Sequence, residues 1–148
     1  MTMLGAGAML AAATLVSEDA ATLTAGALVA AKTLSPAWAI GSVAFGIWAG
    51  DLGLFVIGRL ARRAPVVARW VDRRWSPEEV RTMEGRLNRS APLAILGSRF
   101  LPGTRVLLYV AAGVLHVRAS TFTLAAAVAS IAWTMTIVLA VGSLGAFW

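Results

Sequence analysis

Four long blocks of apolar residues take up most of this 148-residue chain, and they constrain its fold more than any other feature. The blocks run from Met3 to Ala31, from Leu34 to Ile57, from Leu93 to Val117 and from Thr121 to Trp148. The hydrocarbon core of a bilayer, roughly 30 Å thick, is crossed by about 20 apolar residues of α-helix. Only 14% of the residues are charged, whereas an average soluble domain has about 25%. We therefore predict an all-α integral membrane protein.

A basic stretch separates the second apolar block from the third. Nine of the thirteen Lys and Arg residues fall between Arg59 and Arg89. Basic residues next to membrane segments favour the cytoplasmic side and attract anionic lipids. We interpret the net charge of +6 as a sign of membrane orientation rather than of nucleic-acid binding. No Lys or Arg precedes the first apolar run, so we do not expect a cleaved signal peptide there.

Two amphipathic helices are predicted inside this basic stretch. Ser76 is suited to be an N-cap, because Pro77 follows at the first helical position and Glu79 stands three residues after the cap. The apolar faces are Val66, Val67, Trp70 and Val71 in the first helix and Val80, Met83 and Leu87 in the second. We expect both helices to lie in the membrane interface. A solvated helical loop is the alternative.

The two halves of the chain share one order, in which an interrupted apolar block precedes an unbroken one. Ser17-Glu18-Asp19 interrupts the first block, and the segment from Arg99 to Arg105 interrupts the third. The piece from Met3 to Val16 would form only about 21 Å of helix, too short to span a bilayer alone. This order predicts an inverted repeat of a re-entrant helical hairpin plus a transmembrane helix, with interfacial amphipathic helices between the halves. Residues 1–148 would form a single membrane domain, with repeats at 1–58 and 92–148 and the basic region at 59–91.

Charge placement bears on whether the third block is a hairpin or a full span. If residues 59–89 are cytoplasmic, a hairpin returns Arg118 to the cytoplasmic side, whereas a full crossing places Arg118 outside. The positive-inside bias mildly favours the hairpin. Two bent but complete spans stay open as the alternative.

The charged residues inside the apolar blocks are the candidates for function. A charge within hydrocarbon costs roughly 2.5 kcal/mol or more, so it persists when it is paired, hydrated or functional. Glu18, Asp19 and Asp51 come from the first half, and Arg99 and Arg105 come from the second. We expect them to converge, because opposite charges offset each other's burial cost. The acids would carry a coupling proton or the counter-charge, and no feature of the sequence ranks Glu18 above Asp19.

The segment between the two arginines predicts a phosphate site. Pro102 and Gly103 break the helix, and a second half-helix is expected after Thr104 as its cap. Its free N–H groups would then lie beside two guanidinium forks, an arrangement that binds phosphate. The predicted phosphate-binding residues are Arg99, Gly103, Thr104 and Arg105. The alternative is that the arginines only neutralise the buried acids.

Several kinds of chemistry are disfavoured by composition. The chain has no cysteine and one histidine, His116, so disulfides, thiolate metal sites and multi-histidine sites are excluded. We expect no metal, no cofactor and no enzymatic activity. A lipid phosphatase would need a nucleophile, a general base or metal-binding carboxylates. A proton-linked ion exchanger, which would need only Glu18 and Asp51, is the other alternative.

Three segments together resemble the DedA family, bacterial membrane proteins with a VTT (SNARE-associated) domain. Ser98 to Val114 is similar to the family's Arg-Phe-x-Pro-Gly-x-Arg signature. Gly50 to Arg59 resembles its Gly-Asp…Gly-Arg segment. Ser17 to Ala30 resembles its acidic re-entrant segment, with Ser-Glu-Asp where many members have Pro-Gly-Glu. The resemblance covers nearly the whole chain, in the family's order.

The resemblance implies a bacterial inner-membrane protein with two opposed re-entrant helices that transports or scrambles lipid. The implied substrates are undecaprenyl phosphate or phospholipid, with dependence on the proton-motive force in some members. The family's important acids and arginines fall on Glu18, Asp51, Arg99 and Arg105. The chain is shorter than is usual in the family, and the resemblance implies that a final C-terminal helix is missing. The expected partner is therefore a phosphate-bearing membrane lipid, and a homo-oligomer is left open.

Overall fold

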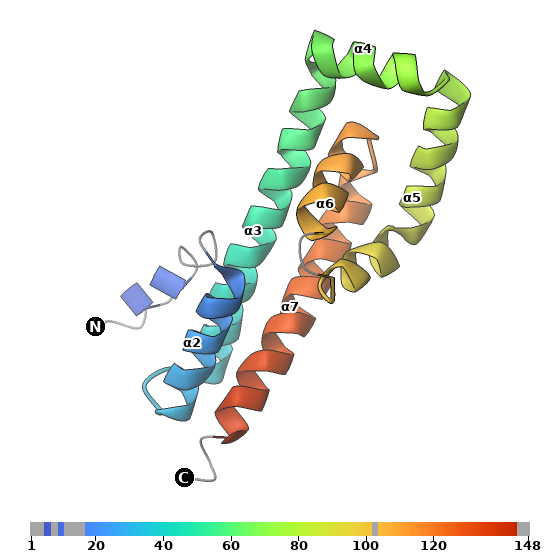
Figure 1. Cartoon of the computed structure of the whole chain (residues 1–148). Helices are drawn as coiled ribbons and strands as arrows, with labels where there is room; N and C mark the ends of the chain where they lie inside the picture. Colours follow the sequence, from blue (N-terminus) through green and yellow to red (C-terminus); the bar gives the residue numbers. More distant parts are fainter. Residues whose placement is uncertain (1–4, 7–8, 11–16, 102–103, 145–148) are drawn as a thin grey trace. The chain divides into compact units, whose positions relative to one another are not determined.

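The computed structural model describes residues 5–6, 9–10, 17–101 and 104–144, which form helices and turns without any strand. The predicted all-α class is therefore confirmed for this part of the chain. The helices are α2 (Glu18–Ala30), α3 (Pro36–Arg63), α4 (Pro65–Arg74), α5 (Pro77–Ser98), α6 (Thr104–Val114) and α7 (Ala119–Leu144) (Figure 1). The predicted half-helix from Met3 to Val16 lies largely outside the described residues.

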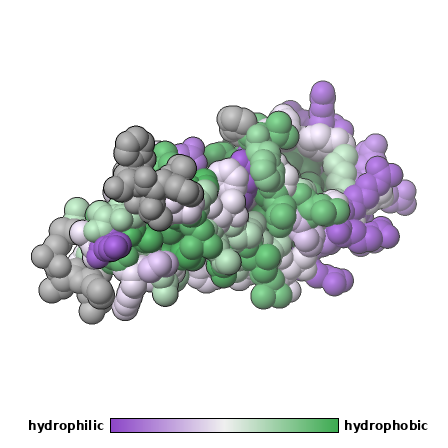
Figure 2. All heavy atoms as spheres, turned by 90° about the horizontal axis from the view of Figure 1, so that it is seen from below, coloured by the Kyte–Doolittle hydropathy of each residue, from purple (hydrophilic) through white to green (hydrophobic). Residues whose placement is uncertain are grey.

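Helices α3 and α7 are long and apolar enough to cross a membrane. Their outward side chains are largely apolar, and large exposed ones include Phe45, Ile57, Leu60, Leu124 and Val128. In contrast, Ser130 and Thr134 of α7 are fully buried. Figure 2 shows broad hydrophobic areas on the face in view, with hydrophilic side chains gathered mainly at the right. Buried polar side chains beneath a largely apolar surface suit a lipid environment, so the membrane prediction is supported.

Helix α3 extends beyond the apolar block from which it was predicted. It continues from Ile57 to Arg63, with Arg62 and Arg63 in its last turn. Cations near a helix C-terminus interact favourably with the helix dipole, which accounts for the extension. The Nη2 atom of Arg62 also lies 2.9 Å from Oδ1 of Asp72 in α4. The basic region thus begins as the end of a long helix.

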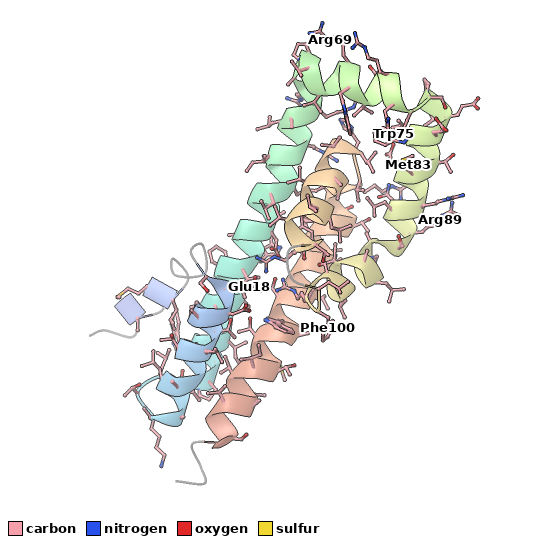
Figure 3. The ribbon with its side chains drawn as sticks, in the orientation of Figure 1. Glu18, Arg69, Trp75, Met83, Arg89 and Phe100 are labelled. Atoms are coloured by element: carbon pink, nitrogen blue, oxygen red, sulfur yellow. The ribbon has the colours of Figure 1, made fainter. Side chains whose placement is uncertain are left out.

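Helices α4 and α5 confirm the two helices predicted in the basic region, and Trp75 lies at the turn between them (Figure 3). Ser76 caps α5 through both hydrogen bonds of a capping box with Glu79. Helix α5 then continues without a break through Pro92 to Ser98. Proline donates no backbone hydrogen bond and bends a helix, and Figure 1 shows α5 bending toward α6 along its second half.

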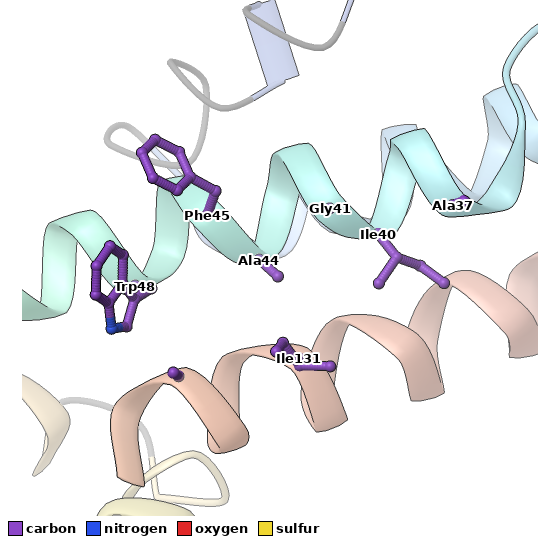
Figure 4. A pocket seen from close by; sticks show the side chains of 8 residues that line it. Ala37, Ile40, Gly41, Ala44, Phe45, Trp48 and Ile131 are labelled. Atoms are coloured by element: carbon purple, nitrogen blue, oxygen red, sulfur yellow. The ribbon is translucent and has the colours of Figure 1, made fainter. Parts of the chain in front are cut away.

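The chain forms two compact units, and each long helix contributes to both. The first unit contains residues Met1–Gly50 and Ala127–Trp148. Here α2 packs closely on α7, because a Cβ atom added to Gly26 would stand 2.7 Å from Cβ of Val141. An apolar groove of about 530 Å³ also lies between α3 and α7 of this unit, next to Phe45 and Ile131 (Figure 4).

The second unit, Asp51–Ala126, contains α4, α5, α6 and the remaining parts of α3 and α7. Gly58 of α3 and Gly113 of α6 bring two helix backbones into direct contact. A Cβ atom at Gly58 would collide with the carbonyl oxygen of Val110, and one at Gly113 would collide with that of Phe55. Glycine is therefore required at both positions for this approach.

The short helices α2 and α6 end in the same backbone motif. Each closes with the paired hydrogen bonds of a Schellman motif, and each places a non-glycine residue in the left-handed region, Lys32 at φ 57° and His116 at φ 54°. The hydrogen bonds are Thr33 N to Leu28 O and Lys32 N to Val29 O after α2, and Val117 N to Ala112 O and His116 N to Gly113 O after α6. A long helix follows each motif within a few residues. Both halves of the chain thus share the local order of short helix, tight turn and long helix.

Candidate functional site

A buried ion cluster joins three predicted site residues within the second unit. Nη2 of Arg99 lies 2.9 Å from Oδ2 of Asp51, and Nε of Arg105 lies 3.6 Å from Oδ1. Each carboxylate oxygen thus faces a different arginine. The side chains of Asp51 and Arg99 are only 2% and 3% exposed, whereas that of Arg105 is 28% exposed. The predicted convergence of Asp51 with both arginines is therefore found in this unit.

The interruption between α5 and α6 places the two arginines on either side of a chain reversal. Arg99 is the C-cap residue of α5, directly after the buried Ser98. Helix α6 begins at Thr104 rather than after it. The Thr104 hydroxyl donates to the carbonyl oxygen of Leu101 at 2.8 Å and to that of Ser98 at 3.4 Å. It therefore ties the new helix back to the carbonyl groups at the end of α5 instead of accepting from the first N–H groups of α6. Gly103 lies outside the described residues.

Two hydrogen bonds bring the α6–α7 turn beside the basic end of α3 and the middle of α5. Nη2 of Arg59 donates to the carbonyl oxygen of Val117 at 2.7 Å. The backbone N–H of Arg118 donates to Oδ1 of Asn88 at 2.9 Å. The two ends of the segment from Asn88 to Arg118 therefore lie side by side, at the same height along α3 as Arg59. Asp51 precedes Arg59 by eight residues of one helix, so the ion cluster lies about 12 Å from that level.

Tyr109 is a member of the site that the sequence analysis did not identify. It is the one tyrosine of the chain, and it is fully buried. Its hydroxyl group interacts electrostatically with Asp51 and with both arginines of the cluster. The hydroxyl lies near Ser98 but forms no well-aligned hydrogen bond within the described part of the chain. The position four residues after Arg105 places both on one face of α6, and that spacing could have pointed to it.

Aromatic rings pack between the ion cluster and the basic end of α3. The ring of Tyr109 meets Phe122 edge-on at 5.1 Å, and Phe122 stacks on Phe55 at 4.4 Å. The guanidinium carbon of Arg59 lies 5.0 Å from the centre of the Phe55 ring. Asp51, Phe55 and Arg59 recur every four residues and so share one face of α3. The rings therefore provide an apolar environment that strengthens the electrostatic interactions of the cluster.

The remaining predicted acids begin α2 in the first unit. Ser17 is the N-cap, as predicted, and its hydroxyl accepts from the backbone N–H of Ala20 at 3.4 Å. Glu18 is the first helical residue (Figure 3), and Asp19 next to it is exposed. Negative charge in the first turn is favoured by the helix dipole. Because both acids belong to the other unit, their pairing with Arg99 and Arg105 stays a prediction.

The ion cluster has the chemistry of an anion site in a low-dielectric interior. Guanidinium groups present donors in a planar fork that matches phosphate oxygens. Arg105 faces Asp51 through Nε and keeps more than a quarter of its side chain exposed. The cluster can therefore meet a phosphate group from the exposed side of Arg105 while Asp51 holds both arginines in place.

Comparison with known protein families finds a match. The model of the VTT domain matches residues 16–143, a range that contains the ion cluster and nearly all of the described helices. Searches among curated proteins and among solved structures give no match.

Proposed function

Since this chain belongs to the VTT-domain family of DedA-type membrane proteins, we propose that it moves a phosphate-bearing lipid between the two leaflets of a membrane. One observation carries the proposal. The buried carboxylate of Asp51 holds Arg99 and Arg105 together at a helix interruption. Charged side chains in an apolar interior are energetically unfavourable and are retained mainly where they have a function.

The lipid headgroup would bind at Arg105. The side chain of this residue is partly accessible, and the first turn of α6 supplies N–H groups without helical acceptors. Arg99, Gly103 and Thr104 complete the proposed phosphate site. A polyprenyl phosphate such as undecaprenyl phosphate and the phosphodiester of a phospholipid share the chemistry that this site recognises.

The second half of α5 and all of α6 would form a re-entrant hairpin. The hydrogen bond between Arg118 and Asn88 supports this, because both arms then end at one level. The depth of the cluster, about 12 Å along α3, would place the tip of the hairpin inside a hydrocarbon core of roughly 30 Å. The matching backbone motifs after α2 and α6 support an inverted repeat in which α2 belongs to an opposed hairpin.

Transport in this proposal is coupled to the buried acids. Asp51 would provide the counter-charge while the site is empty, and Glu18 or Asp19 would carry a proton or a second counter-charge. The proposed location is a bacterial inner membrane, with residues 59–89 facing the cytoplasm as α4 and α5. Their arginines would then follow the positive-inside bias.

A liposome assay with matched lysine variants tests the proposal. Purified protein should accelerate transbilayer movement of a fluorescent phospholipid or polyprenyl phosphate. Arg105→Lys should slow this movement about tenfold or more, since lysine keeps the charge but lacks the fork and forfeits a hydrogen bond to a charged group. Arg73→Lys, an exposed position on α4, is the control and should be neutral. Wild-type rates in Arg105→Lys and in Arg105→Ala would refute the proposal.

A proton-linked ion exchanger is the second candidate, and the complete burial of Asp51 favours it. An exchanger would carry current in liposomes without moving lipid, and its current would survive Arg105→Lys. A lipid phosphatase would instead release inorganic phosphate. We propose transport over hydrolysis because phosphate hydrolysis usually needs a general base such as histidine, and the chain's one histidine occupies an exposed turn.

A further inference from the structure

We propose that a polar hollow between α5 and the start of α7 binds the phosphate group of an anionic lipid headgroup. The hollow has a volume of about 450 Å³. Its lining includes Arg81, Glu84, Asn88 and Arg89 from α5, with Arg118 just before α7 and Thr121 in its first turn. All of these residues belong to the second unit, and none belongs to the ion cluster around Asp51. The site is therefore distinct from the proposed transport site and does not depend on it.

The charges around the hollow favour an anion. Three arginines and one glutamate, Glu84, line it, so the lining carries two more positive charges than negative ones. Among the described residues, none of the three arginines forms an ion pair. Arg62 at the end of α3 behaves differently, because it pairs with Asp72 at 2.9 Å. Cations gathered around a concave surface without carboxylate partners raise the local concentration of anions.

Asn88 holds the two sides of the hollow together. Its Nδ2 donates to the carbonyl oxygen of Glu84 at 3.0 Å, and its Oδ1 accepts from the backbone N–H of Arg118 at 2.9 Å. Arg89, labelled in Figure 3, folds back along α5 so that its Nε donates to the carbonyl oxygen of Gly85 at 3.3 Å. Two guanidinium groups are thus presented from two elements that one side chain ties together. Such forks match the oxygen atoms of phosphate.

The surface next to the hollow identifies a lipid as the source of the phosphate. Leu93, one turn beyond Arg89, is 79% exposed, and Leu96 is also exposed. The surface of α5 therefore changes from basic to apolar at the hollow. In a membrane protein this change marks the level of the lipid phosphates, where a juxtamembrane arginine attracts anionic headgroups. A lipid bound there would keep its acyl chains against the exposed leucines.

Native mass spectrometry of protein extracted from nanodiscs tests this inference. Nanodiscs of phosphatidylglycerol are compared with nanodiscs of phosphatidylcholine, and the retained lipid is counted. We expect wild-type protein to retain phosphatidylglycerol selectively. The double variant Arg89→Gln, Arg118→Gln should lose this retention about tenfold or more, whereas Arg73→Gln, Arg74→Gln, which removes two charges from α4, should keep it. Glu84→Gln removes the one carboxylate of the lining and should increase retention, a gain that misfolding does not produce.

Three outcomes would overturn the inference. Equal losses in the two double variants would show a diffuse charge effect rather than a site. Unchanged retention in Glu84→Gln would show that the hollow does not hold the lipid. Displacement of the lipid by 10 mM inorganic phosphate or glycerol phosphate, a concentration chosen to be about a thousandfold above that of the protein, would assign the hollow to a water-borne anion.

Discussion

Asp51 is the residue on which the charged interior of the second unit depends. Its two oxygen atoms face Arg99 and Arg105, and its side chain is 2% exposed. Asp51→Asn would remove the carboxylate that faces the buried Arg99 and the partly exposed Arg105. Removal of one partner from a buried ion pair costs about 3–5 kcal/mol. We expect a large fall in the free energy of unfolding, measured by denaturant titration in detergent.

Asp72→Asn is the matched control for Asp51→Asn. Asp72 pairs with Arg62 at the same distance of 2.9 Å, but its side chain is 65% exposed. An exposed ion pair contributes only about 0–1 kcal/mol. Similar losses in the two variants would mean that water reaches Asp51 and that the cluster is not a low-dielectric site.

Tyr109 allows the role of one hydroxyl group to be separated from packing. Tyr109→Phe keeps the ring on Phe122, so stability should change by less than about 1 kcal/mol. If the hydroxyl contributes to headgroup binding, lipid movement in liposomes should slow several-fold in this variant. Tyr109→Leu, which also removes the ring, should lower stability as well. Unchanged transport in Tyr109→Phe would restrict Tyr109 to a structural role.

At the scale of the elements, the contact between α3 and α6 determines where Arg105 can lie. Gly113→Ala would force a Cβ atom into the Phe55 carbonyl group and should push α6 away from α3. We expect a lower thermal unfolding temperature and a loss of transport. Gly97→Ala on α5 is the control, because nothing lies within 4 Å of its added Cβ atom. That change should be neutral or stabilising by up to about 1 kcal/mol. Equal behaviour of the two variants would argue against the close packing.

At the scale of the whole molecule, the absence of cysteine from the chain permits a topology test by single substitutions. Lys32, Arg74 and Ser120 are exposed positions outside the ion cluster. With a re-entrant hairpin, Arg74→Cys and Ser120→Cys should react with a membrane-impermeant maleimide from one side, and Lys32→Cys from the other. Reaction of Ser120→Cys from the same side as Lys32→Cys would instead show that α5 and α6 together cross the membrane.

The sequence by itself determined the features that arise within a few residues. Apolar length predicted the long helices, Ser76 and Glu79 predicted the start of α5, and Pro102-Gly103 predicted the interruption before α6. These features depend on hydrophobicity and on hydrogen bonds between neighbours, which a linear sequence displays directly. The sequence also identified the acids and arginines as candidate site residues, because charged residues are rare in apolar blocks.

Only the tertiary structure decided which of these charges meet. Asp51 and Arg99 are 48 residues apart in the chain, and their contact joins the end of α5 to α3. The burial of Tyr109 beside them and the hollow closed by Asn88 and Arg118 likewise depend on how helices distant in sequence pack. The sequence shows that a charge in an apolar segment is energetically unfavourable unless it is paired. Which partner that charge finds depends on the distances between segments, and only the folded chain fixes those distances.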